Sequence, residues 1–399
     1  MNYETQPFYM KSVLVLGANQ RSALAVTRSL GMHGVSLITA DESPTALAGC
    51  SRYSRSYFTC PSPRLHSEDF IAAIAALCKK ENIDIIFPMT ELTTSLLLEH
   101  QDQLPGITLP FPDIKSVDAL ADKHALMKLA ESLNVPIPKT RYAQSPEDLP
   151  VKLTTLDYPL VLKPGKSWLE HQGEWLHTEV RFAENADEAA DILEHDPAFH
   201  AHPFVLQDRV PGKGAGVFAL YEQGNALAFF AHKRLREKPP RGGVSVLSES
   251  VEVDPSLLTY ARTLLDHVGW HGIAMVEFRV EKDGTAHLME INTRFWGSLQ
   301  LSVDSGVDFP WLLYQIACGE EVSPVEAYKT GRRLRWILGD LDSLYLTLRD
   351  EDFSFMDKMQ AMFRFLIPRP FITRHETNRL SDIGPFWWEL KQYFKDLMG

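Results

Sequence analysis

The sequence predicts a chain that combines an α/β domain, an α+β domain and a mostly helical C-terminal segment. Near the start, short apolar runs alternate with segments of helical spacing, which is typical of a parallel sheet covered by helices. The middle contains a succession of strand-like segments, two of which flank a turn signal. The 399 residues are enough for two or three domains with cores of their own.

The first 117 residues are expected to form a Rossmann-like domain. Residues 12–17 (SVLVLG) predict a buried strand that ends in glycine. The loop 17–22 lacks the second and third glycines of the GxGxxG fingerprint, which disfavours a tight site for a dinucleotide pyrophosphate. The elements expected after the first strand are a helix over 22–30, a strand over 35–39, a helix over 69–80, a strand over 83–88 and a helix over 91–99.

Residues 118–330 form the second expected domain, with subdomains 118–205 and 206–330. A helix over 118–133 has to stop before residues 135–138 (VPIP), because proline cannot continue it. The other elements expected here are strands over 160–163, 174–182, 204–209, 216–221 and 226–232, and helices over 186–194 and 255–268.

Residues 331–399 differ from the rest of the chain and are expected to form a separate, mostly helical extension. They carry 11 Lys plus Arg against 10 Asp plus Glu, whereas the preceding residues carry 29 against 42. The segment is also dense in aromatic residues, with Trp387 and Trp388 adjacent.

A predicted hairpin over residues 273–292 brings acidic side chains together. The pair Asp283-Gly284 is preferred at the centre of a two-residue type I′ turn. If this pair forms the turn, Glu277 lies directly opposite Glu290, and Asn292 shares their face. Two carboxylates and an amide oxygen suit Mg²⁺. The alternative is a solvated hairpin whose acids point toward water.

Cationic segments around the hairpin fit a phosphate-bearing ligand. Arg294 follows the hairpin, and its planar donor fork can hold a phosphate or a substrate carboxylate. Lys163 ends an apolar strand and opens into residues 164–168 (PGKSW), which is not a Walker A loop because Leu160 replaces the first glycine. Residues 204–212 predict a strand that runs into a linker, where backbone groups can pair with an adenine edge. A surface turn is the alternative for the loop after Lys163.

These segments, in this order, resemble the ATP-grasp superfamily over about residues 12–325, and in particular its carbamoyl-phosphate-synthase-like members. The first 117 residues resemble the Rossmann-like domain that precedes the grasp fold in such enzymes. The segments that together carry the resemblance are 121–123 (ADK) with 135–138 (VPIP), 160–164 (LVLKP), 205–212 (VLQDRVPG), and Glu277 with 289–294 (MEINTR).

The resemblance implies that ATP lies between two α+β subdomains. The residues implied to contact ATP are Lys123, Lys163, Lys166, Ser167, Gln207, Asp208, Arg209, Val210 and Leu288. Those implied to hold two Mg²⁺ ions, with Mn²⁺ as an alternative, are Glu277, Glu290 and Asn292. Those implied to act at the reacting groups are Lys233 or Arg234 at the γ-phosphate and Arg294 at the acceptor carboxylate. The sequence departs from the family at Asp208, where a glutamate is usual.

The implied activity is that of an ADP-forming carboxylate-amine ligase. ATP converts a carboxylate into an acylphosphate, and an amine, for example that of an amino acid, then displaces phosphate to form an amide or peptide bond. Alternatives within the fold are a phosphoryl transferase, acyl transfer to a nucleophile other than an amine, and a nucleotide-binding protein without turnover. A more distant alternative is a nicotinamide-dependent oxidoreductase.

Charge and hydropathy limit the expected partners. The formal net charge of -12 disfavours binding to nucleic acid. The sequence contains no apolar run of about 18 residues and no signal-peptide pattern at its start, so a cytoplasmic protein is expected. The four cysteines have no metal-type spacing and are expected as free thiols. Whether the chain forms a homodimer is left open.

A helical pattern in the extension supports two hypotheses. Five apolar residues recur on one helix face between residues 350 and 399. The face either contacts an anionic membrane surface or docks on the protein or on a second subunit. The five residues are Phe355, Met359, Met362, Phe363 and Leu366.

Overall fold

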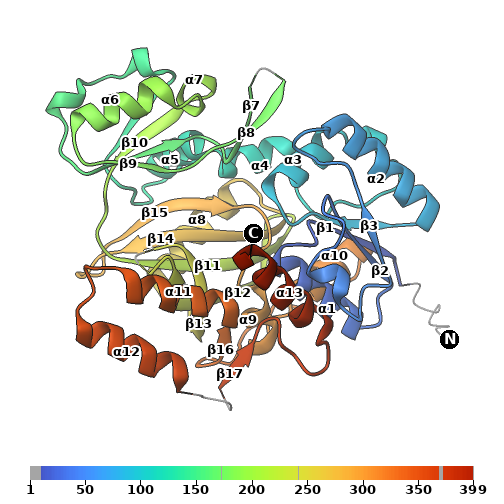
Figure 1. The fold of residues 1–399 in the computed structure, drawn as a ribbon. Helices are drawn as coiled ribbons and strands as arrows, with labels where there is room; N and C mark the ends of the chain where they lie inside the picture. Colours follow the sequence, from blue (N-terminus) through green and yellow to red (C-terminus); the bar gives the residue numbers. More distant parts are fainter. Residues whose placement is uncertain (1–9, 172, 241, 368–371, 399) are drawn as a thin grey trace.

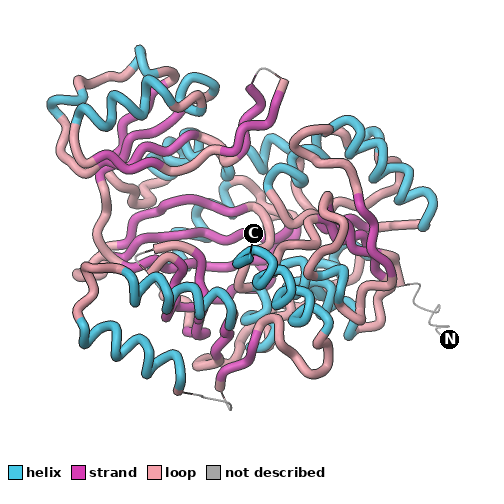
Figure 2. Tube along the Cα trace, viewed as in Figure 1, coloured by secondary structure: helices cyan, strands magenta, loops and turns pink. Residues whose placement is uncertain are grey.

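The fold is built on several β-sheets. The computed structural model describes residues 10–171, 173–240, 242–367 and 372–398. Within these residues the strands form sheets of four, four, seven and two strands. Figure 1 shows the N-terminal sheet on the right, the second four-stranded sheet at the upper left and the seven-stranded sheet beneath it. Figure 2 shows that helices and loops surround these strands.

The N-terminal sheet is parallel and confirms the expected Rossmann-like start. Its order is β3-β2-β1-β4, because the chain adds β2 and β3 on one side of β1 and then crosses back to place β4 on the other side. The edge strand β3 was not expected, and its side chains are half-buried or exposed. The strands are β1 (Val13–Leu16), β2 (Leu37–Asp41), β3 (Ser56–Thr59) and β4 (Ile85–Phe87), and the helices are α1 (Arg21–Met32), α2 (Ser67–Glu81) and α3 (Glu91–Glu99).

The second sheet is antiparallel, with the order β5-β10-β6-β9. The helix expected over 118–133 is two helices, because Asp122 interrupts it and its carboxylate accepts hydrogen bonds from the backbone N–H groups of His124 and Ala125. A separate hairpin of β7 and β8 follows β6. The strands are β5 (Thr140–Ala143), β6 (Leu160–Pro164), β7 (Trp168–His171), β8 (Glu174–His177), β9 (Arg181–Ala183) and β10 (Phe204–Asp208), and the helices are α4 (Ile114–Ala121), α5 (Lys123–Ser132), α6 (Ala186–His195) and α7 (Ala198–Ala201).

The seven-stranded sheet has the order β15-β14-β11-β12-β13-β16-β17. Strand β13 was not expected, and β12 extends six residues beyond the predicted strand end at residue 232. The strands are β11 (Lys213–Glu222), β12 (Asn225–Lys238), β13 (Val244–Val251), β14 (Gly272–Val280), β15 (Ala286–Asn292), β16 (Arg333–Arg335) and β17 (Thr373–His375), and the helices are α8 (Pro255–His267), α9 (Leu299–Ser305) and α10 (Phe309–Cys318).

The C-terminal extension is mostly helical, as expected, and it also contributes β16 and β17 to this sheet. Among the described helices, none has both the length and the apolar character needed to cross a membrane. Figure 1 shows the last helix beside the N-terminal domain. The helices of the extension are α11 (Ile337–Arg349), α12 (Phe355–Leu366) and α13 (Gly384–Met398).

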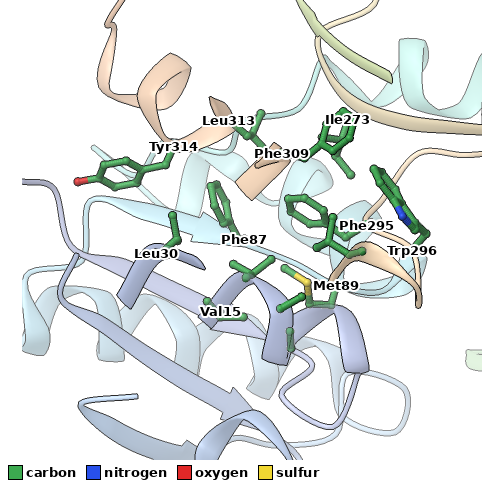
Figure 3. Packing of buried hydrophobic residues seen from close by; sticks show 14 of the residues in the cluster. Val15, Leu30, Phe87, Met89, Ile273, Phe295, Trp296, Phe309, Leu313 and Tyr314 are labelled. Atoms are coloured by element: carbon green, nitrogen blue, oxygen red, sulfur yellow. The ribbon is translucent and has the colours of Figure 1, made fainter. Parts of the chain in front are cut away.

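One hydrophobic core joins the N-terminal sheet to the seven-stranded sheet. Val15 of β1 and Phe87 of β4 belong to the same buried cluster as Ile273 of β14 and Phe309 of α10. Figure 3 shows these side chains between the two regions, with Phe295 near Phe87. Because burial of apolar area is the main stabilising contribution, the two regions are expected to keep a fixed relative position.

Residues 376–382, here called the C-terminal strap, fasten the extension to α1. Arg28 of α1 is 3% exposed and donates hydrogen bonds to the Asp382 carboxylate and to the backbone oxygens of Glu376, Thr377 and Asp382. The Asp382 carboxylate also accepts a hydrogen bond from Ser51. A buried guanidinium requires such partners, so the strap is part of the core of the folded protein.

Candidate active site

The hairpin of β14 and β15 places Glu277 directly opposite Glu290, as the sequence predicts. The predicted two-residue turn is wrong, because the strands end at Val280 and Ala286 and their pairing is shifted by one residue. A β-bulge next to Glu277 removes this shift. Phe278 pairs with Leu288 and Glu277 pairs with Glu290, so Met289 is an extra residue without a partner in the ladder. The pairing of the two glutamates is therefore correct because two deviations cancel.

The two glutamates share an amide donor. Asn292 pairs with Met275 two positions along the hairpin, and its Nδ2 lies 3.2 Å from Oε1 of Glu277 and 3.2 Å from Oε1 of Glu290. Burial raises the pKa of Glu277. The charge of Glu290 raises this pKa further, whereas Arg234 lowers it. This arrangement of like charges is destabilising by itself, so a cation on this face would relieve it.

Two buried lysines approach the same carboxylates from the other side. Lys123, the first residue of α5, has its Nζ 3.7 Å from Oε2 of Glu290. Lys163 in β6 is buried, and burial together with the nearby Lys123 lowers its pKa to about 8, against the opposing effect of Glu290. Burial raises the pKa of Glu290, but the two lysines, together with the Asn292 amide and Arg294, outweigh that effect and hold the pKa below its usual value.

Arg234 and Lys233 lie on opposite faces of β12. Arg234 donates from Nη2 to Oε2 of Glu277 at 2.8 Å and lines the same cavity as the glutamates. Lys233 instead pairs with Glu249 of β13 at 2.5 Å, because successive side chains of a strand alternate between the faces. Of the two alternatives that the resemblance implies, the structure brings only Arg234 to the glutamates.

A cavity of about 590 Å³ opens over the glutamates, and three regions of the chain line it. A second cavity, also about 590 Å³, lies over the carboxyl ends of the N-terminal strands. Asn19, Gln20 and Arg294 border both cavities. Arg294 therefore stands at the junction of two spaces large enough for small molecules.

The loop after β6 lies away from the glutamates. Lys166 pairs with Asp118 of α4 at 2.8 Å. The backbone N–H of Ser167 lies 3.3 Å from Oε1 of Glu91, and Ser167 lines the second cavity. The structure thus places Lys166 apart from Lys123 and Lys163. It places Ser167 in the second cavity, which Arg294 also borders.

The predicted adenine linker follows the end of β10. Gln207 is buried and donates to Thr140 at 3.0 Å, and its Oε1 has no hydrogen-bond partner within the described ranges. Asp208 pairs with Arg141, Arg209 is exposed, and Val210 receives a hydrogen bond from Arg279 on its backbone oxygen. Leu288, in β15, is fully buried. A buried acceptor without a partner is the kind of group that a ligand donor satisfies.

Several residues that line the first cavity lie outside the set predicted for the ligase reaction. Among them are Arg21 of the N-terminal domain and three side chains of the extension, Trp336, Trp388 and Glu389. The dense aromatic composition of the extension was the only signal for them, because their position depends on contacts between residues far apart in the chain.

The donor set at the hairpin fits Mg²⁺ rather than a metal that needs many protein ligands. Among the residues that the structure describes, no group of three or more His, Cys, Asp or Glu side chains is placed to hold a metal ion. Mg²⁺ is commonly held by one or two carboxylates together with water and substrate phosphates. Glu277 and Glu290, with the amide of Asn292, satisfy that description.

Family models match two parts of the chain. Residues 13–109 match the model described as PylC-like, N-terminal domain. Residues 200–339 match the model described as ATP-grasp in the biosynthetic pathway with Ter operon. The chain therefore contains a PylC-like N-terminal domain followed along the sequence by an ATP-grasp domain. This finding confirms the resemblance noted from the sequence.

Curated relatives share parts of their length with the chain. A formate-dependent phosphoribosylglycinamide formyltransferase of Sulfurisphaera tokodaii is 31% identical over 119 residues, which cover 29% of this chain and 29% of the relative. A carbamoyl phosphate synthase large chain of Thermoanaerobacter is 22% identical over 237 residues, which cover 57% of this chain and 21% of the relative. The chain thus spans less than a third of the length of these relatives.

Solved structures with the same fold extend the match to most of the chain. A biotin carboxylase of Campylobacter jejuni in complex with β-γ-ATP has a TM-score of 0.64 at 20% identity, over 82% of this chain and 74% of that protein. An L-amino acid ligase of Bacillus licheniformis has a TM-score of 0.60 at 16% identity, over 78% and 75%. A biotin carboxylase domain of Hydrogenobacter thermophilus in complex with MgADP and bicarbonate has a TM-score of 0.64 at 15% identity, over 82% and 74%. These likenesses establish the fold.

Proposed function

We propose that the protein is an ATP- and Mg²⁺-dependent ligase that joins a small-molecule carboxylate to an amine. One observation carries the proposal: Glu277, Glu290 and Asn292 meet two buried lysines beside an arginine that borders two cavities. Transfer of a phosphoryl group to a carboxylate needs groups that neutralise phosphate charge and a cation that orients the acceptor, and no side-chain nucleophile. The site supplies these groups.

ATP occupies the space between the second sheet and the seven-stranded sheet in this proposal. Lys123 and Lys163 bind its phosphates. Their charges, which face Glu290 in this structure, then interact with the phosphates as well as with Glu290. The linker 207–210 pairs with the adenine edge, and Leu288 packs against the adenine face. Glu277, Glu290 and Asn292 would hold two Mg²⁺ ions, which would neutralise phosphate charge.

The reaction proceeds in two steps. An oxygen of the substrate carboxylate attacks the γ-phosphorus of ATP, the bond from that phosphorus to the bridging oxygen breaks, and ADP leaves. The amine then attacks the acyl carbon, inorganic phosphate leaves, and the nitrogen loses a proton. Arg234 faces the transferred phosphoryl group, and Arg294 orients the carboxylate. The two cavities that meet at Arg294 provide one space for each substrate.

Trapping with hydroxylamine tests this proposal without knowledge of the natural amine. The protein is incubated with MgATP, hydroxylamine and a panel of amino acids, hydroxy acids and dicarboxylates. An acylphosphate reacts with hydroxylamine to give a hydroxamate and phosphate, and the hydroxamate is measured as its coloured iron(III) complex. We expect ADP and hydroxamate in equal amounts with at least one carboxylate, and neither product from the Glu290→Gln variant.

The alternatives give different products in the same assay. ADP without hydroxamate would indicate phosphoryl transfer to an acceptor other than a carboxylate. Stabilisation by MgATP without either product would favour a nucleotide-binding protein without turnover. Stabilisation by NADH but not by MgATP would contradict the proposal and favour an oxidoreductase.

A further inference from the structure

Arg21 borders the cavity over the glutamates, although it belongs to the N-terminal domain. It is the first residue of α1 and lines the cavity with Glu277, Glu290 and Arg294. The proposed function assigns the reacting carboxylate to Arg294, which follows Asn292 by two residues. Arg21 is thus a third arginine of the cavity, beside Arg234 and Arg294, and it has no role in that reaction.

Side chains of the C-terminal extension hold Arg21 in place. Glu376, the first residue of the C-terminal strap, accepts a hydrogen bond from Nη1 of Arg21 at 2.6 Å and is itself 2% exposed. The guanidinium lies 4.2 Å from the ring centroid of Trp336. Trp336 in turn donates from Nε1 to Oε1 of Glu389 at 2.6 Å. A long side chain held on two sides loses little further entropy when it binds a ligand.

The rest of the Arg21 guanidinium is available to a ligand. Among the described residues, only Nη1 has a hydrogen-bond partner, which leaves Nη2 and Nε with donors to spare. Nη2 lies 3.0 Å from where a Cβ would stand on Gly297, three residues after Arg294. The partial positive charge at the start of α1 adds to the attraction for an anion.

The wall around Arg21 also indicates the size and character of the ligand. Leu47, Trp336 and Trp388 give this end of the cavity apolar surface. The cavity, at about 590 Å³, has room for a molecule of the size of an amino acid or a short dicarboxylate. An acid with a short carbon chain between two anionic groups would contact Arg294 with one group, the apolar wall with the chain, and Arg21 with the other group.

We propose that Arg21 binds a second anionic group of the carboxylate substrate and that the C-terminal extension positions it. The substrate class is then a small diacid, or an acid with another anionic group. This inference rests on the proposed function, because it assigns the first anionic group to Arg294 at the reacting centre. It also gives the extension a role in the site, since without Glu376 and Trp336 the Arg21 side chain would be free to move.

Binding of matched acids and amides tests the inference separately from turnover. Succinate is compared with succinamate, glutarate with glutaramate, and L-glutamate with L-glutamine, by thermal shift or calorimetry in the presence of MgADP. We expect the wild-type protein to bind the diacid more tightly by about ten- to a hundredfold, the range for a charge-assisted hydrogen bond. Arg21→Gln should remove the preference, and Arg21→Lys should retain part of it.

Arg52→Gln is the matched control. Arg52 is exposed, contacts the C-terminal strap through the backbone oxygen of Ser381 at 3.4 Å, and does not border the cavity. This variant should keep the wild-type preference. A preference that persists in Arg21→Gln, or that is equally reduced in Arg52→Gln, would overturn the inference.

A double substitution tests whether Glu376 acts through Arg21. Glu376→Gln should raise the dissociation constant for the diacids and leave that for MgADP unchanged. Combined with Arg21→Gln it should cause no further loss, because the residue that it positions is already absent. Additive losses in the double variant would show that Glu376 does not act by positioning Arg21.

The two proposals fail in different ways. Equal affinity of the wild-type protein for diacids and half-amides overturns the role of Arg21, even where hydroxamate is formed from another carboxylate. A diacid preference with no hydroxamate and no ADP release supports the anion site and contradicts the ligase reaction.

Discussion

The two faces of the seven-stranded sheet carry similar charged residues that are compensated to different degrees. On the face of α11 and α12, Glu249 lies 2.5 Å from both Lys233 and Arg333. Burial raises the pKa of Glu249, but the two cations outweigh this effect and hold the pKa below its usual value. On the face of the cavities, Glu277 has one cation partner among the described residues, Arg234, and stands opposite a second carboxylate, Glu290. Burial raises the pKa of Glu277 although Arg234 opposes this effect. Adjacent residues of β12 supply a cation to each face.

The difference separates charges that maintain the fold from charges that await a ligand. A carboxylate between two arginine or lysine side chains is already neutralised and gains little from another cation. Two opposed carboxylates, of which one has a raised pKa, repel each other unless a cation binds between them. The site is therefore distinguished from the rest of the sheet by how far its carboxylate charges are neutralised by neighbouring cations, more than by the types of residue.

The largest expected effect comes from a single carboxylate on each face. Glu290→Gln should lower ADP release by at least about a hundredfold, the usual cost of removing a group that stabilises transferred charge. Glu249→Gln, its counterpart on the other face, should change the rate by less than about threefold. Steady-state ADP release measures both, with circular dichroism to confirm that each variant is folded. Comparable losses in the two variants would remove the distinction between the faces.

Two neighbouring cations give the next test. Arg234→Gln should reduce turnover by about tenfold or more, because Arg234 contacts Glu277 and faces the proposed phosphoryl group. Lys233→Gln, one residue away, should leave turnover within about twofold, because its side chain pairs with Glu249 on the opposite face. The reverse order of effects would show that β12 is rotated in the active protein.

The pKa of Lys163 predicts a pH dependence of nucleotide binding. Burial lowers this pKa to about 8, so the side chain is protonated below that pH and becomes neutral above it. The dissociation constant for MgADP should therefore rise as the pH increases through about 8. Lys163→Arg should bind more weakly but flatten this dependence, because a guanidinium stays charged. Calorimetry between pH 6.5 and about 9.5 measures both profiles, and a flat wild-type profile would contradict the prediction.

The smallest effect is expected on the outer surface of α12. Phe355, Phe363 and Leu366 are 75%, 60% and 66% exposed, while Met359 and Met362 on the same helix are half-buried. Replacing the three exposed residues by serine should change stability by no more than about 0.5 kcal/mol and leave turnover within about twofold. Thermal unfolding and ADP release measure these effects.

The same triple variant tests the hypothesis of a membrane contact. Flotation of the wild-type protein, but not of the variant, with liposomes of anionic lipid would support it, and equal behaviour would contradict it. Removal of residues 350–399 would be a poor test, because it also removes the C-terminal strap on which Arg28 depends.

The sequence predicted those parts of the fold that depend on local pattern. Buried strands such as β1 and helices such as α3 follow from apolar periodicity and were placed within a few residues. The break between α4 and α5 was missed, although aspartate is a preferred N-cap residue, because helix-forming residues continue on both sides of Asp122. Strand β13 was missed because its polar residues, such as Ser248 and Ser250, are buried only by neighbouring strands.

In the candidate site, too, the residues that belong to one local pattern could be predicted and those brought together by distant contacts could not. Glu277, Glu290 and Asn292 could be found together because they belong to one hairpin, although the turn was wrong by one residue and the bulge at Met289 was not visible in the sequence. Lys163 was noted as a cation at the end of an apolar strand, whereas Lys123 came only from the resemblance to a family. Arg21, by contrast, joins Glu376 across 355 residues of chain, a contact that no local pattern reports.

Arg28 cannot reach its folded surroundings until the ribosome has added Asp382, 354 residues later in the chain. At common rates of synthesis this delay is on the order of tens of seconds. During that time the guanidinium stays hydrated and the face of α1 that the strap covers stays open to solvent. The N-terminal domain therefore emerges before the C-terminal strap that completes it, so a nascent chain, or one that ends before the strap, presents an unfinished surface to the chaperones and proteases of the cell.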